Sequence, residues 1–139
     1  TAQLLPNAEI VVVTTPQIAA AEVAIRAGMM ATLISQRLAG VIENMSAVNC
    51  GKCGEQMALF GEGGGNKVAD ELSKATQKEV PLLGKVPFDV RIREGGDNGM
   101  PLPISNPDAP AATVMNQIVE SLLRNSPRSL AGKALKLTN

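Results

Sequence analysis

The sequence contains no histidine, tryptophan or tyrosine, and it has only two phenylalanines among its 139 residues. Without histidine, the chain cannot build a serine–histidine or cysteine–histidine catalytic pair or a metal site with histidine ligands. With so few aromatic rings, it is poorly suited to stacking nucleic-acid bases. Two cysteines are too few for a disulfide framework and are typical of a reducing compartment.

Neither sign of charge is in excess, because thirteen basic residues balance thirteen acidic ones. Residues 124–139 hold four basic residues and no acidic one, so residues 1–123 carry nine basic against thirteen acidic residues, a balance of −4. A net negative charge over residues 1–123 does not predict nucleic-acid binding. The apolar runs are much shorter than the ~20 residues of a membrane-spanning helix, and the first residues do not resemble a signal peptide. We therefore expect neither a nucleic acid nor a membrane as partner.

The hydrophobic pattern predicts alternating strands and helices, and 45% hydrophobic residues suffice for a core. The expected strands are short apolar runs rich in β-branched residues, at 7–15, 38–42 and 81–86. The expected helices have apolar residues at spacings of three and four, at 15–37, at 66–78 and after Asp108. Residues 89–110, rich in glycine and proline, are expected to form a loop. Tight strand–helix–strand joints favour an α/β fold, with a parallel sheet flanked by helices.

The first helix is expected to begin at Thr15-Pro16, with threonine as N-cap and proline in the first helical position. Its spacing predicts one apolar stripe, formed by Ile18, Ala21, Ile25, Met29 and Leu33. This stripe is expected to face the sheet.

The strongest chemical feature is Cys50-Gly51-Lys52-Cys53. Two thiolates at this spacing can bind one metal atom, because the intervening pair lets the backbone curl and Lys52 favours the thiolate form. Three interpretations stay open at this point. The pair is half of a four-sulfur metal or cluster site that a second copy completes around a two-fold axis, or a redox dithiol, or two incidental thiols.

The glycine-rich stretch Gly61–Lys67 does not match a phosphate-binding loop, because Asn66 and Val68 stand where the last glycine and the Ser/Thr belong. We expect a turn with special backbone angles. No Walker A motif occurs in these residues.

Two polar segments follow the second and third expected strands, at the carboxyl ends where open α/β sheets bind their ligands. They are Glu43-Asn44 and Pro87-Phe88-Asp89. Asn44 could read a base edge through paired donor and acceptor, and Asp89 could accept from an amine or cap a turn. From the residues alone, ordinary turn and cap roles are favoured.

Seven segments, in this order, are similar to the C-terminal half of the Mrp/ApbC-type iron–sulfur cluster carriers, which belong to the MinD/ParA-like branch of P-loop ATPases. The segments are VVVTTPQ (11–17), GVIENMS (40–46), CGKC (50–53), FGEGGG (60–65), VPLLGKVPFD (80–89), REGGDNGMP (93–101) and SNPDAPAA (105–112). The similarity covers about residues 2–123, and the run from GVIENMS to FGEGGG is specific to this family.

The resemblance implies a cytoplasmic, ATP-hydrolysing homodimer that holds an iron–sulfur cluster, of the 4Fe–4S type, between two chains and delivers it to apo iron–sulfur proteins. Cys50 and Cys53 match the pair that binds the cluster. Asn44, Pro87 and Asp89 match the positions that surround the adenine of ATP. Two alternatives stay open: a dimeric CxxC module that clamps a structural zinc, and a dithiol redox protein.

The family's phosphate loop and switch motif lie N-terminal to the part matched here. Residues 1–123 are therefore expected to be the C-terminal portion of a P-loop ATPase domain, and residues 124–139 a basic, mobile tail. ATP and Mg²⁺ would bind in the full-length parent, and this segment alone is predicted not to hydrolyse ATP, because the phosphate loop carries that chemistry. The sheet is also expected to have one open edge.

Overall fold

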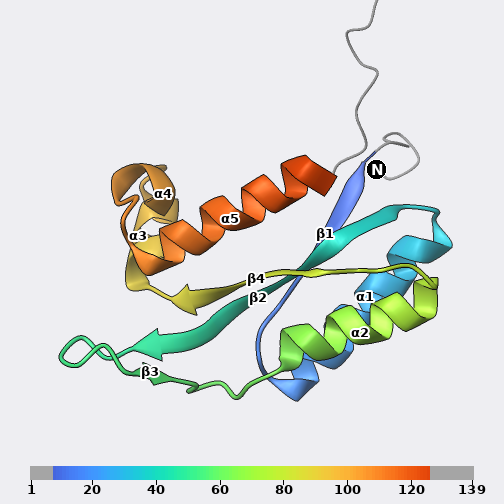
Figure 1. The fold of residues 1–139 in the computed structure, drawn as a ribbon, viewed down its shortest axis with the longest axis horizontal. Coiled ribbons are helices and arrows are strands. Elements are labelled where there is room, and N and C mark those ends of the chain that lie inside the picture. Colours follow the sequence, from blue (N-terminus) through green and yellow to red (C-terminus); the bar gives the residue numbers. More distant parts are fainter. Residues whose placement is uncertain (1–7, 126–139) are drawn as a thin grey trace, which may run out of the picture.

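The computed structural model describes residues 8–125, in which strands and helices alternate along most of the chain (Figure 1). In chain order the elements are β1 (Glu9–Thr14), α1 (Ile18–Leu33), β2 (Arg37–Asn49), β3 (Gln56–Met57), α2 (Gly64–Thr76), β4 (Leu82–Phe88), α3 (Val90–Asp97), α4 (Leu102–Ser105) and α5 (Pro110–Asn125). Most of the basic tail expected at residues 124–139 lies outside the described residues.

Strand β2 is the centre of the sheet. On one side, β1 pairs with it in parallel, up to Thr14 opposite Glu43. On the other side, β4 pairs in parallel, from Leu82 opposite Val41 onward. The short β3 is antiparallel and pairs with the last residues of β2. The expected α/β fold with a mainly parallel sheet is confirmed.

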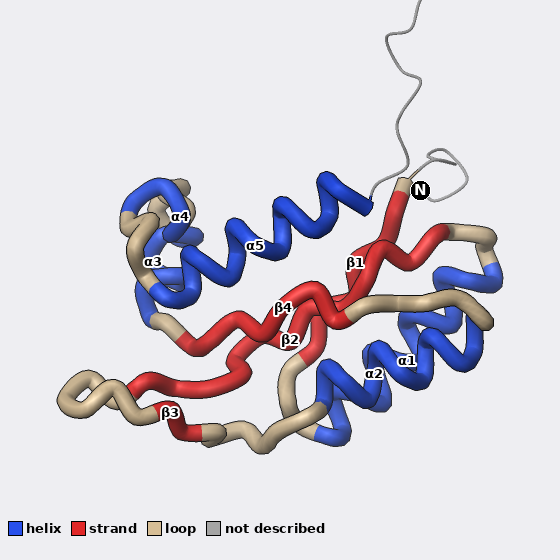
Figure 2. Tube along the Cα trace, in the orientation of Figure 1, coloured by secondary structure: helices blue, strands red, loops and turns tan. Residues whose placement is uncertain are grey.

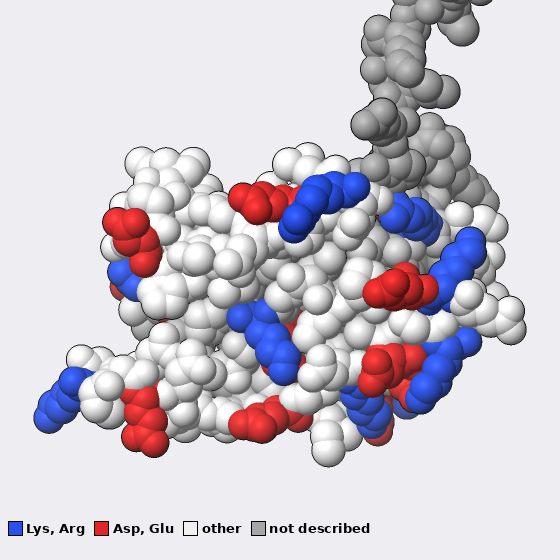
Figure 3. All heavy atoms as spheres, viewed as in Figure 1, with Lys and Arg blue, Asp and Glu red and all other residues white. Residues whose placement is uncertain are grey.

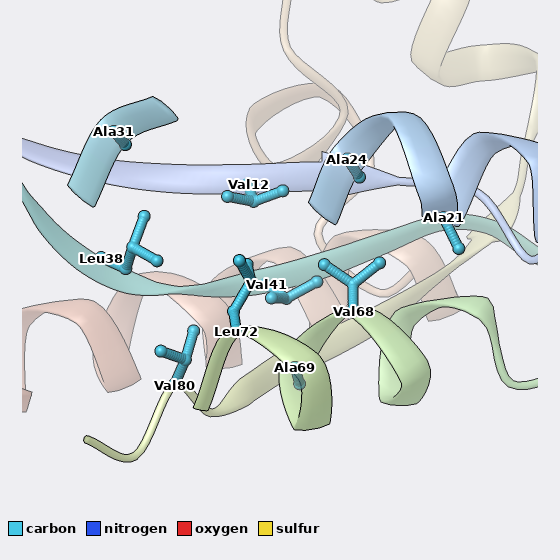
Figure 4. Packing of buried hydrophobic residues seen from close by; sticks show 10 residues of the cluster. All are labelled: Val12, Ala21, Ala24, Ala31, Leu38, Val41, Val68, Ala69, Leu72 and Val80. Atoms are coloured by element: carbon cyan, nitrogen blue, oxygen red, sulfur yellow. The ribbon is translucent and has the colours of Figure 1, made fainter. Parts of the chain in front are cut away.

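Helices cover both faces of the sheet, with α1 and α2 on one face and α5 on the other (Figure 2). The first apolar cluster joins β1 and β2 to α1 and α2, with Val41, Val68 and Leu72 fully buried (Figure 4). The second cluster packs Val86 of β4 against residues of α4 and α5, among them Leu102 and Ile118. Each face of the sheet thus has its own core.

The stripe predicted for the first helix was right at Ala21, which is buried, and at Ile25, which packs against the core, and wrong at its other residues, because α1 buries a face of small residues. Ile18 and Leu33 are 66% and 78% exposed. Helix α1 is apolar around most of its circumference, so spacing alone does not show which face is buried. The close approach of α2 selects the small face, since a Cβ added at Gly28 would lie 2.7 Å from the methyl carbons of Leu72. The buried residues are Ala21, Ala24, Gly28 and Ala31.

The predicted cap of α1 was wrong as well. The helix begins at Ile18 after Gln17, which is in an extended conformation. The hydroxyl of Thr15 donates to the side-chain oxygen of Gln17 instead of capping the helix. The Thr15 hydroxyl is therefore bonded to the Gln17 side chain and not to a backbone N–H group of the helix.

Strand β2 is longer than predicted: it ends at Asn49 and not at Ile42. Met45 has a φ of 57°, and the register with β4 shifts between Asn44 and Val48. Polar residues interrupt the apolar run after Ile42, and this irregularity breaks the alternation of side chains, so neither sequence signal of a strand continues to Asn49.

Residues 89–110 were predicted to be a loop but contain α3 and α4. The Asp89 side chain caps α3 by accepting from the Arg91 N–H at 3.0 Å. The cap offsets the low helix propensity of Gly95 and Gly96.

Basic and acidic side chains are interspersed on the face shown in Figure 3 and form no continuous patch of one sign there. Within residues 8–125, none of the helices has the length and apolar character that crossing a membrane requires.

Candidate functional site

The two cysteines lie in the turn that joins β2 to β3, a hairpin that extends beyond the helices (Figure 1). Two backbone hydrogen bonds close the turn. The Cys50 N–H donates to the Glu55 carbonyl at 2.8 Å, and the Gly54 N–H donates to the Cys50 carbonyl at 2.9 Å. Gly54 has a φ of 74°, a left-handed conformation that glycine adopts without strain. We call residues 48–57 the cysteine hairpin.

Both thiols are accessible from outside. Cys53 is exposed, Cys50 is partly exposed, and the two are free thiols. A Cβ added at Gly51 or Gly54 would meet nothing within 4 Å. The turn is therefore open to another protein.

Hydrogen bonds stabilise the thiolate of Cys50. The backbone N–H groups of Cys53 and Lys52, together with the Cys53 thiol, hold the pKa of Cys50 below its usual range. Desolvation opposes this lowering of the pKa but is the smallest of the effects. The thiolate is the form that binds metals and attacks electrophiles. Cys50 is thus prepared for either role.

Two thiols are half of the ligand set that tetrahedral zinc or a cubane cluster requires. Across residues 8–125, no group of three or more His, Cys, Asp or Glu side chains lies close enough together to hold a metal ion. One hairpin therefore offers two of the four donors of such a site.

Strands β2 and β4 bring the other predicted site residues close together. Asn44 lies opposite Val86, and Pro87 follows Val86 on β4. The side-chain oxygen of Asn44 accepts from the Met45 N–H at 2.9 Å. These residues therefore occupy neighbouring strands towards the carboxyl end of the parallel sheet, as predicted.

Asp89 comes directly after β4 and is held by Arg91. Its Oδ1 accepts from Arg91 Nε at 2.9 Å, and its Oδ2 accepts from Nη2 at 2.6 Å. Arg91 holds the pKa of Asp89 below its usual range. The cap role that the sequence allowed is present in the structure, and contact with a nucleotide stays a prediction for Asp89.

An open apolar groove of about 740 Å³ lies between β1 and α1. Its polar lining residues are Thr14, Thr15 and Asn44, and the others are apolar residues of these two elements and Ile34, which follows α1. The cysteines, Pro87 and Asp89 are not among the lining residues. The groove is therefore a feature separate from the cysteine hairpin.

Sequence reasoning missed the role of Glu43, which is only 2% exposed. Its Oε2 accepts from the Gly65 N–H at 2.6 Å, and its Oε1 lies 3.9 Å from Lys85 Nζ. A carboxylate is a favourable partner for the free N–H groups at the start of a helix, here α2. The available signal was an acidic residue within an apolar strand, because a buried charge requires a partner.

The glycines before α2 form a turn and a close packing contact. Gly61 and Gly63 have φ values of 88° and 83°, so the predicted special backbone angles are confirmed. A Cβ on Gly64 would lie 2.6 Å from the carbonyl oxygens of Thr15 and Pro16. The glycines thus let α2 start against the turn that follows β1.

Residues 1–123 match the family model ParA, described as NUBPL iron-transfer P-loop NTPase. The chain is 49% identical over 136 residues to an iron-sulfur cluster carrier protein of Mycobacterium tuberculosis, covering 98% of this chain and 35% of that protein. It is 40% identical over 114 residues to an iron-sulfur cluster carrier protein of Pyrococcus furiosus, covering 81% and 36%. The chain thus spans about a third of the length of the curated relatives it matches.

The fold is similar to that of solved MinD structures. The cell division ATPase MinD of Pyrococcus furiosus aligns with a TM-score of 0.60 at 22% identity, covering 84% of this chain and 42% of that one. The MinD cell division protein of Aquifex aeolicus aligns with a TM-score of 0.55 at 17% identity, covering 98% and 49%. At these identities the likeness concerns the fold alone.

Proposed function

This chain belongs to the ParA family of NUBPL iron-transfer P-loop NTPases, and from that premise we propose that two copies hold an iron–sulfur cluster between their cysteine hairpins and deliver it to apo-proteins. The observation that supports this most is the exposed turn, in which one thiolate is stabilised and one chain offers two sulfurs. A 4Fe–4S cluster, which takes four thiolates, suits two such turns. The proposal places the carrier in the cytoplasm.

The cluster is the cargo of this reaction. On binding, Cys50 and Cys53 each release a proton to the solvent, and each thiolate sulfur bonds an iron atom. Delivery is a ligand exchange, in which a recipient thiolate forms a bond to iron as a cysteine sulfur of the carrier leaves. One bond forms for each that breaks, and no electron is transferred. The open turn gives the recipient access to the irons.

ATP and Mg²⁺ belong to the proposal for the whole protein, of which this chain spans about a third, judged by its relatives. We place Asn44, Pro87 and Asp89 around the adenine, because Asn44 lies on β2, Pro87 on the neighbouring β4, and Asp89 directly after β4. The sequence has no phosphate-loop motif, so this chain alone is predicted not to hydrolyse ATP.

Two other functions use the same residues. A structural zinc clamped between two hairpins would take the same four sulfurs. A dithiol redox protein would use the lowered pKa of Cys50 for attack on a disulfide. The three functions differ in the metal that is bound and in whether the two thiols are reversibly oxidised to a disulfide.

Anaerobic reconstitution with ferrous iron and sulfide tests the proposal. We expect about four iron and four sulfide per two chains, with visible absorbance, and loss of both in Cys50→Ala and in Cys53→Ala. Gly51→Ala is the matched control, because an added Cβ there meets nothing and both thiols remain. The loaded chain should then transfer its iron to an apo-ferredoxin.

Other outcomes identify the alternatives. A colourless chain with about one zinc per two chains after reconstitution indicates the structural clamp. A chain without metal, whose thiols cycle reversibly to a disulfide, indicates the redox protein. Either result overturns the cluster proposal.

A further inference from the structure

Three apolar side chains form a row across the sheet beside the cysteines. Val48 of β2 lies opposite Met57 of β3 on one side and opposite Phe88 of β4 on the other. Side chains of directly opposite residues on neighbouring strands point to the same face of a sheet. Met57, Val48 and Phe88 therefore share one face, and we call them the apolar row.

The apolar row is open to solvent. Met57 is 41% and Phe88 is 39% exposed, and Val48 is half-buried. None of the three belongs to either apolar cluster that flanks the sheet. The row is thus apolar surface that the packing of this chain leaves uncovered, which is typical of a contact surface.

The turn beside the row carries one charge of each sign. Lys52 and Glu55 are both exposed and stand on either side of Cys53. Within residues 8–125, neither forms an ion pair. In a two-fold contact each residue pair occurs twice, so Lys52 of each copy can meet Glu55 of the other. The turn is therefore complementary in charge to a second copy of itself.

We propose that the apolar row, together with Lys52 and Glu55, is the surface on which a second copy of this chain docks. This inference rests on the proposed function, because a four-sulfur cluster requires two hairpins. The row lies next to the cysteines in both strands of the hairpin, since Val48 precedes Cys50 and Met57 follows Cys53. When the apolar rows of two copies are in contact, their two cysteine-containing turns lie next to each other.

The small size of the surface predicts when the copies associate. Stable interfaces bury about 800 Å² per partner, and a row of three side chains covers only a part of such an area. The bonds between sulfur and iron must therefore supply the remaining free energy of association. The two copies should therefore associate firmly only when the cluster is bound, and separate when a recipient removes it.

Light scattering on the full chain under anaerobic conditions tests this surface, before and after reconstitution with ferrous iron and sulfide. In dilute solution, before the apolar β1–α1 face associates, we expect one chain per particle without the cluster and two with it. Met57→Ser and Phe88→Ser together should raise the concentration at which half of the loaded chain is dimeric by about tenfold or more, because apolar contact is lost. Leu123→Ser and Val119→Ser are the controls, since these side chains are exposed on α5, away from the hairpin.

A charge exchange gives a second, independent readout. Lys52→Glu alone places two acidic residues opposite each other, and Glu55→Lys alone places two basic ones opposite each other, so each should weaken the loaded dimer. The double variant restores opposite charges across the axis and should restore association. Recovery in the double variant is not expected from damage to folding or to the cysteines.

The outcomes separate this surface from the proposed function. A wild-type chain that holds no iron overturns both. A wild-type chain with about four iron per two chains, whose row and charge variants dimerise as the wild type does, overturns the docking surface alone. Row variants that dimerise normally but deliver iron more slowly also overturn it, because they assign the row to the recipient.

Discussion

Cys50 differs from an ordinary surface cysteine because its thiolate receives hydrogen bonds from its own turn. Hydrogen bonding by the backbone N–H groups of Cys53 and Lys52, and by the Cys53 thiol, lowers the pKa of Cys50. A lowered thiol pKa favours metal binding at neutral pH, because the thiol must lose its proton to become a ligand.

Removing the side-chain donor should raise the pKa of Cys50 without restoring its usual value. In Cys53→Ala the two backbone N–H donors remain, so only a part of the lowering is lost. The measurement is the pH dependence of Cys50 alkylation by iodoacetamide, followed by mass spectrometry. The midpoint should move to higher pH in Cys53→Ala and stay in Gly51→Ala. An unchanged midpoint in Cys53→Ala would contradict the assigned hydrogen bond.

Asp89 should stabilise the fold through α3. Replacing it with alanine removes the cap and its ion pair with Arg91, at a cost of about 1 kcal/mol in the free energy of unfolding. Asp97→Ala is the control, because the ion pair of Asp97 with Arg93 is exposed and contributes little. Urea unfolding of the two variants measures the difference, and equal stabilities would contradict the cap assignment.

The pH dependence of this contribution follows from the lowered pKa of Asp89. A carboxyl group with a lower pKa in the folded state stabilises that state above its unfolded pKa of about 4. The stabilisation is lost as the pH falls through the folded value. The difference between wild type and Asp89→Ala should thus be full at neutral pH and shrink in acid.

At the scale of elements, Glu43 fixes the start of α2 to the central strand. Its buried carboxylate accepts from the Gly65 N–H, so Glu43→Ala leaves that donor without a partner and should cost about 2 kcal/mol. Glu43→Gln keeps an acceptor oxygen and should cost less. Urea unfolding measures both variants. Equal losses in the two would show that the hydrogen bond to Gly65 is not what Glu43 contributes.

The contact between α1 and α2 predicts a non-additive pair of substitutions. Gly28→Ala normally stabilises a helix by about 1 kcal/mol, but here the added Cβ would lie 2.7 Å from Leu72. The gain should be absent in the wild type and appear in a Leu72→Ala background, where the methyl groups are gone. A double-mutant cycle from denaturant unfolding measures this coupling. Additive free energies would contradict the close contact.

The order of strands and helices could be predicted because each has its own hydrophobic period, but their faces and ends could not. The choice of the small face of α1 depends on Leu72 of α2, far along the chain. The end of β2 is hidden by the irregularity at Met45. The helix α3 depends on Asp89, whose cap outweighs two glycines. In each case a contact or a single hydrogen bond overrides local pattern.

The candidate site was predicted in its residue types and not in its geometry. The spacing of Cys50 and Cys53 alone left a ligand pair, a redox dithiol and two incidental thiols open, and the family resemblance favoured the ligand pair. Their position in a hairpin depends on the pairing of β2 with β3, and the apolar row depends on the register of three strands. The bond from Glu43 to Gly65 joins residues that only the folded chain brings together.

At the scale of the whole molecule, the face formed by β1 and α1 exposes apolar side chains that should favour self-association. Val13, Val23 and Met30 are between 59% and 65% exposed and line the apolar groove. Among the described residues β1 pairs only with β2, in line with the predicted open edge. In a protein as long as the curated relatives, of which this chain spans about a third, we propose that this face contacts the remaining residues.

Lysine on this face should reduce self-association of the isolated chain. Val23→Lys and Met30→Lys place a charge on exposed apolar surface, and their cost in stability should be within about 0.5 kcal/mol. Val119→Lys, at an exposed position of α5, is the control. Light scattering without cluster, at increasing concentration, measures the effect. Equal association in all three variants would contradict the role of this face.

The central claim is that two chains share one cluster through four cysteine sulfurs. Native mass spectrometry of the anaerobically reconstituted chain tests it most directly, because it counts chains and metal atoms in the same particle. We predict a particle of two chains with about four iron and four sulfide, absent in Cys50→Ala and in Cys53→Ala. A cluster carried by a single chain, or a particle of two chains that holds zinc or no metal, would contradict the account.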